Sequence, residues 1–358
     1  MIDFLIIGGG IAGISAAARL APLGSVTVLE AEDGLGYHAS GRSAAMFEEN
    51  YGSPSTIALN RASRDFLTTA HGGVLSPRGF MMVAAPHEAH AFAATFAELG
   101  METISVAEAA RKIPIINTDK MDRAGFHEDA QDIDTDLLLQ NYARMARAKG
   151  AKIETRSRVI AIRKTATGWT VQTDTSDHTA RILINAAGAW VDKVAQLAGI
   201  APIGFTPNRR SMARIPAPGG HDVTNWPMLF GPGESWYAKP DAGKFLVSPA
   251  EEDPTTPHDA WADDMVLAEG IARYEAAVTE SVTRVEHTWA GLRTFSPDRS
   301  LVIGFEPSDA TFFWLAGQGG YGMQSSPAAS QLTADLIAGC PPELDETALR
   351  QLGPGRFG

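Results

Sequence analysis

The stretch Phe4-Leu5-Ile6-Ile7-Gly8-Gly9-Gly10-Ile11-Ala12-Gly13 decides the fold of this chain. Its apolar start predicts a buried parallel strand, and its glycines match the pattern G-x-G-x-x-G. The small and apolar residues 14–20 predict a helix, and Val26-Thr27-Val28-Leu29 predicts a second strand that ends at Glu30. The glycine pattern alone also occurs in ordinary tight turns. Strand, turn, helix and strand in this order instead predict a dinucleotide-binding unit.

Each part of this unit has a physical task. Gly8 permits the tight turn, Gly10 lets the backbone approach a pyrophosphate, and Gly13 lets the helix pack closely on the strand. The helix N-terminus offers free N–H groups and a positive dipole end to phosphates. Glu30 follows Gly8 by 22 residues, where an acid typically binds ribose hydroxyls. No arginine follows Glu30 closely, so a 2′-phosphate is not expected.

Composition narrows the remaining choices. A length of 358 residues suggests two lobes, and a formal net charge of −12 disfavours nucleic acid and anionic membrane surfaces as partners. No run of 18 apolar residues occurs, so no membrane span is expected. The single cysteine, Cys340, cannot form an internal disulfide, and the first strand leaves no room for a signal peptide. We therefore expect a cytoplasmic protein. The histidines lack zinc-site spacing, so no metal is expected.

Three later segments favour FAD over NAD. Residues 36–45 are small and hydroxyl-rich with one arginine, which suits a chain that passes along a pyrophosphate and a flavin edge. Residues 182–190 form an apolar run that ends in small residues. Residues 312–324 predict a strand, a glycine-rich turn and a helix whose N-terminus would stabilise negative charge on a reduced flavin. The expected cofactor is noncovalent FAD, with contacts from Gly8, Gly10, Ile11, Ala12, Gly13, Glu30, Arg42, Ser43, Ala44, Val159, Ala187, Gly188, Gly319, Gly320, Tyr321, Gly322 and Met323.

Nearly the whole chain resembles the glycine oxidase and D-amino-acid oxidase/dehydrogenase family of flavoproteins, and within it the bacterial FAD-dependent D-arginine dehydrogenases. The resemblance rests on residues 36–45, 51–52, 75–78, 132–136, 185–190, 209–211, 237–243, 287–293 and 318–324. It implies an α/β fold with a Rossmann-like FAD-binding lobe and an interleaved, mostly antiparallel-sheet substrate lobe. The expected FAD-binding domain comprises 1–71, 141–202 and 286–358, and the substrate-binding domain comprises 72–140 and 203–285. The Pro- and Asp-rich stretch 251–264 reads as a surface excursion.

The resemblance also implies a catalytic site. Arg210, Arg293 and Tyr237 fall on its carboxylate-binding positions, and guanidinium groups bind carboxylates in bidentate fashion. From the residues alone an arginine is more often a surface or ion-pair residue, but Arg293 follows a mostly apolar stretch where a charge needs a partner. Tyr51 falls on a mobile active-site loop, with Glu234 as its gate partner. Gly320 and Gln324 fall on positions that line the substrate, although Gly320 also fits plain turn geometry.

The expected substrate pocket departs from that of a D-arginine dehydrogenase. Phe80 stands where such an enzyme has a carboxylate for the substrate guanidinium, and Met46 stands where it has a histidine. Met228 and Phe230 are expected to border the same pocket. These residues favour a neutral or apolar substrate side chain. Glu48 and its neighbour Glu49 are the exceptions, since either would supply a carboxylate from another direction.

The expected function is FAD-dependent oxidative deamination of a D-amino acid by hydride transfer from the α carbon to the flavin. The electron acceptor is expected to be quinone- or dye-like, and the protein a monomer or homodimer. Oxidation of a 2-hydroxy acid or an N-methyl amino acid by the same residues is an alternative. A dinucleotide-binding sensor without catalysis and a nicotinamide dehydrogenase are alternatives of other classes.

Overall fold

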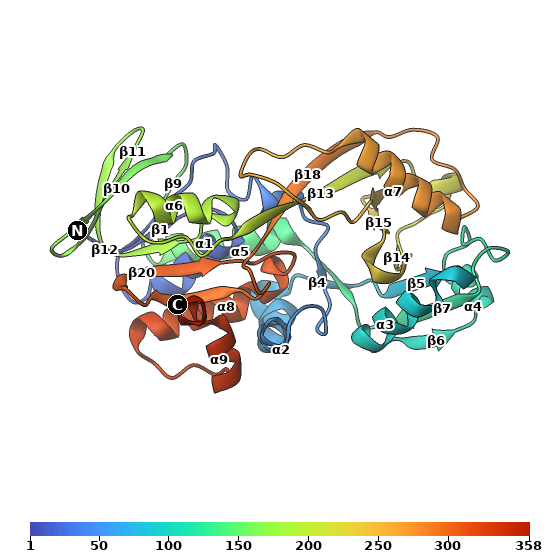
Figure 1. Cartoon of the computed structure of the whole chain (residues 1–358), viewed down its shortest axis with the longest axis horizontal. Helices are drawn as coiled ribbons and strands as arrows, with labels where there is room; N and C mark the ends of the chain where they lie inside the picture. The colour runs from blue at the N-terminus through green and yellow to red at the C-terminus, as the bar shows by residue number, and fades with distance from the viewer.

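The computed structural model describes residues 1–358, which fold into two lobes (Figure 1). The first lobe holds both chain termini, and the second lies at the other end of the long axis. Two long strands, β13 (Thr206–Ile215) and β18 (His287–Phe295), pair along their length and lead from the junction into the second lobe. Residues on these strands can therefore reach the space between the lobes.

An eight-stranded sheet forms the centre of the first lobe. Strands β12, β1, β2 and β9 are parallel neighbours, β20 pairs in parallel with the end of β12, and β10 and β11 complete an antiparallel edge. The sheet comprises β1 (Ile2–Ile7), β2 (Val26–Leu29), β9 (Lys152–Glu154), β10 (Val159–Thr165), β11 (Gly168–Thr173), β12 (Asp177–Asn185), β19 (Val302–Glu306) and β20 (Asp309–Ala316). The predicted first and second strands are thus parallel neighbours in one sheet, as a βαβ unit requires.

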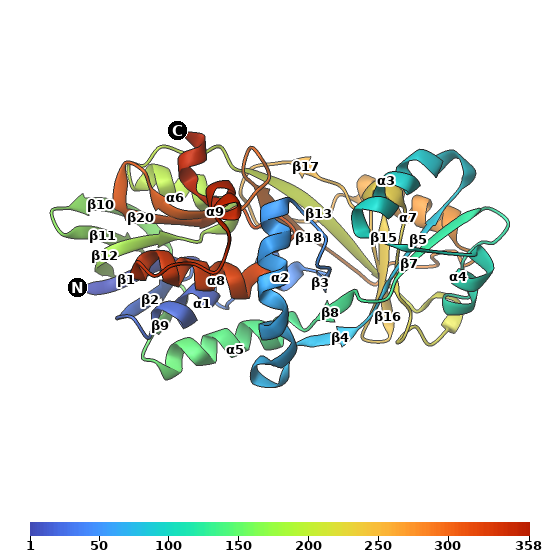
Figure 2. The same cartoon turned by 90° about the horizontal axis from the view of Figure 1, so that it is seen from below.

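Helices cover this sheet and bury its apolar side chains. Helix α1 packs against both α5 and α8, and α2 packs on α8 (Figure 2). The close approach is possible because α1 carries Ala16 and Ala17, which have no exposed surface. The helices of this lobe are α1 (Ile11–Leu20), α2 (Pro54–Thr69), α5 (Thr135–Ala148), α6 (Val191–Leu197), α8 (Gly322–Ala338) and α9 (Glu346–Leu352).

The second lobe contains a nine-stranded, mostly antiparallel sheet in which only β5 and β14 pair in parallel. Besides β13 and β18 it comprises β5 (Phe80–Ala84), β6 (Glu102–Ile104), β7 (Arg123–His127), β14 (Met228–Phe230), β15 (Tyr237–Asp241), β16 (Lys244–Ser248) and β17 (Asp253–Pro254). Its helices are α3 (Ala89–Leu99), α4 (Val106–Lys112) and α7 (Asp264–Ala277). Two of the expected substrate-binding residues lie on strands of this sheet, Arg210 on β13 and Arg293 on β18.

A small sheet of β3 (Met46–Phe47), β4 (Leu75–Pro77) and β8 (Gln131–Ile133) joins the lobes. Two bounds of the expected domain division do not coincide with the ends of the observed elements. The expected boundary between 140 and 141 falls inside α5, which packs on α1 and belongs to the first lobe. The expected first-domain segment 286–358 begins with β18, which is part of the second sheet. The domain division itself stays a prediction. No helix combines the length and apolarity that a bilayer span requires.

Candidate active site

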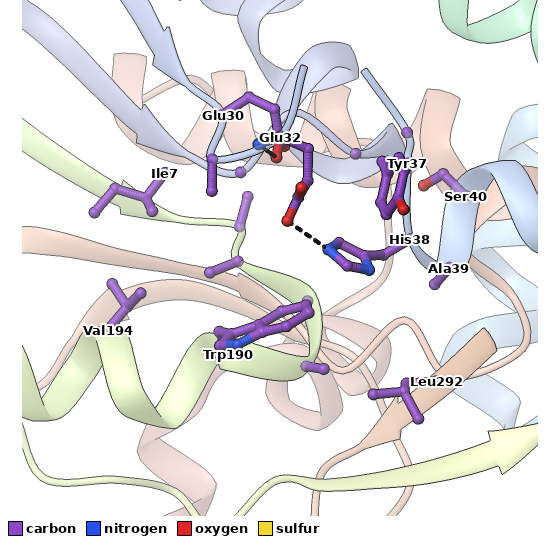
Figure 3. A pocket seen from close by; sticks show the side chains of 18 of the residues that line it. Ile7, Glu30, Glu32, Tyr37, His38, Ala39, Ser40, Trp190, Val194 and Leu292 are labelled. Carbon is purple, nitrogen blue, oxygen red and sulfur yellow. Dashed lines mark hydrogen bonds and ion pairs between the residues drawn. The ribbon is translucent and has the colours of Figure 1, made fainter. Parts of the chain in front are cut away.

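Three neighbouring cavities lie in a row at the junction of the lobes. The first includes Gly8, Glu30, His38 and Trp190 in its lining (Figure 3). The second shares Gly10, Ser40 and Arg42 with the first, and the third shares Arg210, Tyr237 and Arg293 with the second. The row therefore links the phosphate turn at one end to the expected substrate residues at the other.

The phosphate turn has no room for side chains. Gly8 has a φ of +111°, and a Cβ there would lie 2.4 Å from the carbonyl oxygen of Ala186. A Cβ on Gly13 would lie 2.0 Å from the carbonyl oxygen of Gly8, so this glycine allows helix and strand to touch but lines none of the three cavities. The local geometry therefore agrees with the predicted tasks of Gly8 in the tight turn and of Gly13 in close packing of helix on strand.

Glu30 is oriented by the turn that it follows. Its Oε2 accepts a hydrogen bond from the Gly9 N–H at 2.6 Å, and its Oε1 accepts one from the Glu32 N–H at 2.8 Å. The residue is only 9% exposed and lines the first cavity, where Figure 3 shows it above the ring of Trp190. Each oxygen keeps a further lone pair, so the carboxylate can still accept from ribose hydroxyls.

Two helix N-termini face the second cavity. Helix α1 begins after Gly10, which has no side chain, and α8 begins after Tyr321, whose side chain makes no cap hydrogen bond. The Ile11 N–H at the start of α1 donates to Ser40 Oγ at 3.0 Å. Gly10, Ile11 and Ala12 line the cavity from α1, and Gly319, Gly320, Gly322 and Met323 line it from the α8 side. The N–H groups at a helix N-terminus suit a pyrophosphate and an electron-rich ring. The residues present therefore fit a bound dinucleotide.

Most of the other predicted cofactor residues also lie along these cavities. Val159 and Ala187 line the first, Ser43 and Ala44 line the second, and Gly188 lines both. Tyr321 is an exception, since it lines the third cavity and contacts Tyr51 edge to face. Its place is therefore on the substrate side.

Arg42 lines the first and second cavities, but its guanidinium is already bonded to protein groups. Its Nε donates to the Tyr37 carbonyl at 3.2 Å, and its Nη1 donates to the carbonyls of Ala260 at 2.8 Å and Ala290 at 3.0 Å. Its Nη2 pairs with Asp259. These donors are therefore engaged with the chain itself, and the expected contact of Arg42 with the cofactor stays a prediction.

The register of β13 and β18 brings the two expected carboxylate-binding arginines together. Asn208 pairs with Arg293, and Arg210 pairs with Gly291. Because side chains alternate along a strand, Arg210 and Arg293 project from the same face. Gly291 adds no side chain opposite Arg210, so the guanidinium can extend into the second and third cavities.

A carboxylate of the protein lies against these two arginines. Glu234 Oε2 is 3.4 Å from Arg210 Nη1 and 3.9 Å from Arg293 Nη1, and its side chain is 42% exposed. Arg293 Nη1 also donates to the Tyr51 hydroxyl at 3.5 Å. Tyr51 and Glu234, which were expected to form a gate, are thus neighbours at the arginine pair.

The charges at this site depend on one another. Burial, together with the nearby carboxylate of Glu234, raises the pKa of Tyr51. Burial opposes ionisation of Glu234, but Arg293 and Arg210 outweigh it and hold the pKa of this carboxyl below its ordinary value. Burial also opposes the charge on Arg293, but Tyr51, Tyr237 and Glu234 outweigh burial and hold the pKa of Arg293 above its ordinary value. At neutral pH the site therefore holds charged guanidinium groups that an incoming carboxylate can use.

Gly320, Gln324 and Tyr237 complete the lining beside the arginines. Gly320 has no positive φ, but a Cβ there would lie 3.0 Å from Arg293 Nη1, so its small size makes room for the guanidinium. The Gln324 amide oxygen accepts from the Glu48 N–H at 2.9 Å, which leaves its buried Nε2 without a protein partner. The Tyr237 hydroxyl lies 3.2 Å from Met212 Sδ.

Aromatic and thioether side chains line the third cavity. Phe80 and Phe230 meet edge to face with ring centroids 5.5 Å apart, and they are 8% and 4% exposed. They come together because Met228 pairs with Phe80 across β14 and β5. Met228 and Met46 also line this cavity. The structure thus brings all the expected pocket residues to one place.

The two neighbouring glutamates behave differently. Glu48 lines the third cavity at 2% exposure, and its Oε2 lies 3.0 Å from His127 Nε2. Burial raises the pKa of Glu48. Glu49 instead pairs with Arg61 at 3.0 Å and Arg64 at 2.9 Å and does not line the cavity. Only Glu48 can therefore act from inside the pocket.

Sequence reasoning missed several residues of this site. Glu252 Oε1 lies 3.2 Å from Arg210 Nη2, and its Oε2 lies 2.8 Å from Arg299 Nη2. Lys239 is 8% exposed, and its Nζ donates to the carbonyls of Ala44 and Ala45 and pairs with Asp132 Oδ1 at 2.6 Å. A lysine between the apolar residues Ala238 and Pro240 of a strand is a signal for such a buried pair, because a buried charge needs partners. No comparable signal marks Glu252 or Arg299.

Residues 3–336 match the DAO family of FAD dependent oxidoreductases, so the chain belongs to this family. A curated relative, FAD-dependent oxidoreductase domain-containing protein 1 of Xenopus laevis, is 24% identical over an alignment of 399 positions including gaps, which covers 94% of this chain and 79% of that protein. These findings confirm FAD as the cofactor and identify the protein as an FAD-dependent oxidoreductase.

Solved structures share the fold. The FAD-bound L-alpha-glycerophosphate oxidase of Mycoplasma pneumoniae aligns with a TM-score of 0.82 at 18% identity, over 94% of each chain. Glycine oxidase of Geobacillus kaustophilus aligns with a TM-score of 0.81 at 20% identity, over 96% of each chain. The predicted α/β fold with parallel and antiparallel sheets is confirmed. The finer resemblance to D-arginine dehydrogenases stays a prediction.

Proposed function

We propose that this FAD-dependent oxidoreductase oxidises a D-amino acid with a neutral or apolar side chain at its α carbon. The observation that carries the proposal is the arginine pair, Arg210 and Arg293, where the second and third cavities meet. A carboxylate of the protein, Glu234, already lies against both guanidinium groups. The pair is therefore suited to bind the carboxylate of a substrate.

The chain's own residues orient the substrate. Arg210 and Arg293 bind the carboxylate, and Tyr237 adds a hydroxyl beside them. Tyr51 and the loop that bears Glu234 cover this end of the cavity and limit the entry of water. FAD, when bound, would supply the two-electron acceptor for the hydride from the α carbon, and the substrate amino group would lose a proton to water. The resulting imino acid would then hydrolyse in water to the oxo acid and ammonia. Orientation and a dry site account for most of the expected rate enhancement.

The lining of the third cavity supports a neutral or apolar side chain. A guanidinium or ammonium placed against Phe80 and Phe230 without a partner would lose several kcal/mol of hydration. A cation–π contact would return only about 0.5–2 kcal/mol. Glu48 offsets this balance less than an exposed carboxylate would, because burial raises its pKa and thereby disfavours its charged form.

A substrate screen tests the proposal as a whole. The purified flavoprotein is incubated with a dye acceptor and both enantiomers of the amino acids, together with 2-hydroxy acids and N-methyl amino acids. We expect dye reduction with neutral or apolar D-amino acids. Turnover restricted to hydroxy acids or N-methyl amino acids would contradict the proposed substrate class and favour those compounds as substrates instead. Flavin that no compound reduces would favour a sensor.

A substitution at Phe80 tests the side-chain preference. We expect the parent enzyme to prefer D-leucine, D-methionine and D-phenylalanine over D-arginine, and Phe80→Glu to shift the ratio of kcat/KM values toward D-arginine. Phe80→Gln is the control, because it adds polarity at the same place without charge. A parent enzyme that prefers D-arginine would contradict the pocket argument and make Glu48 the first residue to change.

The cofactor is expected to be held without a covalent bond. Residues 36–45, which are expected to pass the flavin edge, are called the flavin loop, and they include His38. His38 faces the first cavity, where its Nε2 lies 3.1 Å from Glu32 Oε1 (Figure 3). Acid precipitation should therefore release the yellow colour into the supernatant. Colour that stays with the precipitated protein would show a covalent link.

A further inference from the structure

One segment of the second lobe crosses to the first lobe at the cofactor cavity. Both of its ends are anchored in the second lobe: the Thr255 N–H donates to the Pro207 carbonyl at 2.9 Å, and the Asp263 side chain caps α7. Between these anchors, residues 256–262 reach the flavin loop. We call these residues the crossing segment. They lie within the stretch that the sequence suggested to be a surface excursion.

Asp259 is the main contact of the crossing segment with the flavin loop. Its carboxylate pairs with Arg42, accepts from the Tyr37 hydroxyl at 3.2 Å, and lies 3.9 Å from His38 Nδ1. The neighbouring Ala260 carbonyl accepts from Arg42 Nη1 at 2.8 Å. Arg42 therefore joins two consecutive residues of the segment to the first lobe.

The contact is also packed. Ala260 is 8% exposed and belongs to a small apolar cluster with Ala189, Ala290 and Leu292. The same arginine stacks over the Tyr37 ring, with its Cζ 5.2 Å from the ring centroid. Packing of this kind indicates a defined position for the segment rather than a chance encounter of two surfaces.

The crossing segment forms part of the wall of the first cavity. His258 and Ala260 line this cavity together with Glu30 and Trp190. Figure 3 shows Tyr37, His38 and Leu292 on the same side of it. Because Glu30 is the expected ribose ligand and the glycine turn the expected pyrophosphate site, this cavity corresponds to the adenosine half of FAD.

We propose that the crossing segment is a clasp that retains FAD, with Asp259 and Arg42 as its fastening. The clasp closes the adenosine end of the cofactor site from the opposite lobe, and Arg42 acts through the clasp. FAD can then leave only after the Asp259 contacts open. Retention of the cofactor thus depends on residues that lie more than 200 positions apart in the chain.

The test measures release of FAD from the holoenzyme by the rise in flavin fluorescence after dilution. Because the Asp259 carboxylate is 58% exposed, solvent weakens its ion pair with Arg42, and Asp259→Ala should release FAD about two- to fivefold faster than the parent. Tyr37→Phe, which removes the hydrogen bond from the Tyr37 hydroxyl to Asp259, should have a smaller effect in the same direction. Asp253→Ala is the matched control, because Asp253 pairs with Arg209 at 3.0 Å within the second lobe.

The outcomes separate a clasp from general loss of stability. Asp259→Ala and Asp253→Ala should have similar melting temperatures as apoproteins, and FAD should protect the crossing segment from proteolysis in the parent but not in Asp259→Ala. Release at the parent rate in both Asp259→Ala and Tyr37→Phe would overturn the proposal. An equal acceleration in Asp253→Ala would do the same.

Discussion

The two ends of the row of cavities are built in different ways. At the cofactor end, glycine, alanine and serine residues around the phosphate turn supply much of the lining, and Gly8 leaves no space even for a Cβ. At the substrate end, the lining comes from long charged and aromatic side chains such as Arg210, Glu234 and Phe80. We therefore expect added side-chain atoms at the cofactor end to impair FAD binding. At the substrate end we expect removal of a charge to impair catalysis.

The largest effect is expected from an added methyl group at the cofactor end. Gly8→Ala would put a Cβ 2.4 Å from a backbone oxygen at a φ of +111°, so both a clash and backbone strain oppose folding. Strain alone costs about 1–3 kcal/mol, and the clash adds to it. We expect little soluble protein and no bound flavin absorbance.

Gly34→Ala is the control for this change. A Cβ at Gly34 meets nothing within 4 Å, so this variant should retain parental melting temperature and flavin content. If Gly8→Ala bound FAD as well as Gly34→Ala, the contrast between the two ends would fail.

The next largest effect is expected from lost charge at the substrate end. Arg210→Met and Arg293→Met should each retain flavin but lose about 2–5 kcal/mol of transition-state stabilisation, or roughly 30-fold to several thousand-fold in kcat/KM. Arg214→Met, on the same strand but paired with Glu286 at the surface, should behave as the parent. Activity within about threefold of the parent in both test variants would contradict their role as carboxylate ligands.

A smaller effect is expected at Glu234, which lies where a substrate carboxylate would bind. Glu234→Gln removes an internal competitor for the arginine pair, so a carboxylate inhibitor such as benzoate should bind about two- to fivefold more tightly. The measurement is titration of the flavin absorbance with benzoate. Glu49→Gln, whose carboxylate pairs outside the cavity, is the control. Weaker benzoate binding by Glu234→Gln would instead indicate a supporting role for this carboxylate.

The smallest effect is expected away from both ends. Burial opposes ionisation of Asp298, but hydrogen bonds from Arg356 and Ser296 lower its pKa to about 2. A lowered pKa in the folded state means that the stabilisation is present above the ordinary value of 3.8 and is lost as the pH falls toward 2. Because the side chain is 45% exposed, the contribution is about 1 kcal/mol or less.

Asp298→Asn should therefore lower the melting temperature slightly at pH 6 and progressively less between pH 4 and pH 2.5. Flavin content and kcat should not change, since neither end of the row of cavities is altered. A difference in melting temperature that grew as the pH fell would contradict the assigned pKa direction.

The cofactor end was predictable because local geometry determines it. Gly8 and Glu30 belong to one contiguous unit, and steric limits on the turn leave only glycine at the first of them. The substrate end was predictable only in part. Arg210, Arg293 and Phe80 were found through a family resemblance, and nothing in their own sequence neighbourhood indicated that they share a cavity. Their meeting follows from the pairing of β13 with β18 and of β5 with β14, which are distant in sequence.

By itself, the sequence determined the glycine turn, the strands around it and therefore the site of a dinucleotide, because hard-sphere limits and hydrophobic burial act over neighbouring residues. Only the tertiary structure decided which charges become partners. It made Arg42 the partner of Asp259, and it directed Glu48 into the pocket and Glu49 out of it. The physical reason is that an ion pair depends on distance in space, and the sequence does not specify that distance until the lobes have packed together.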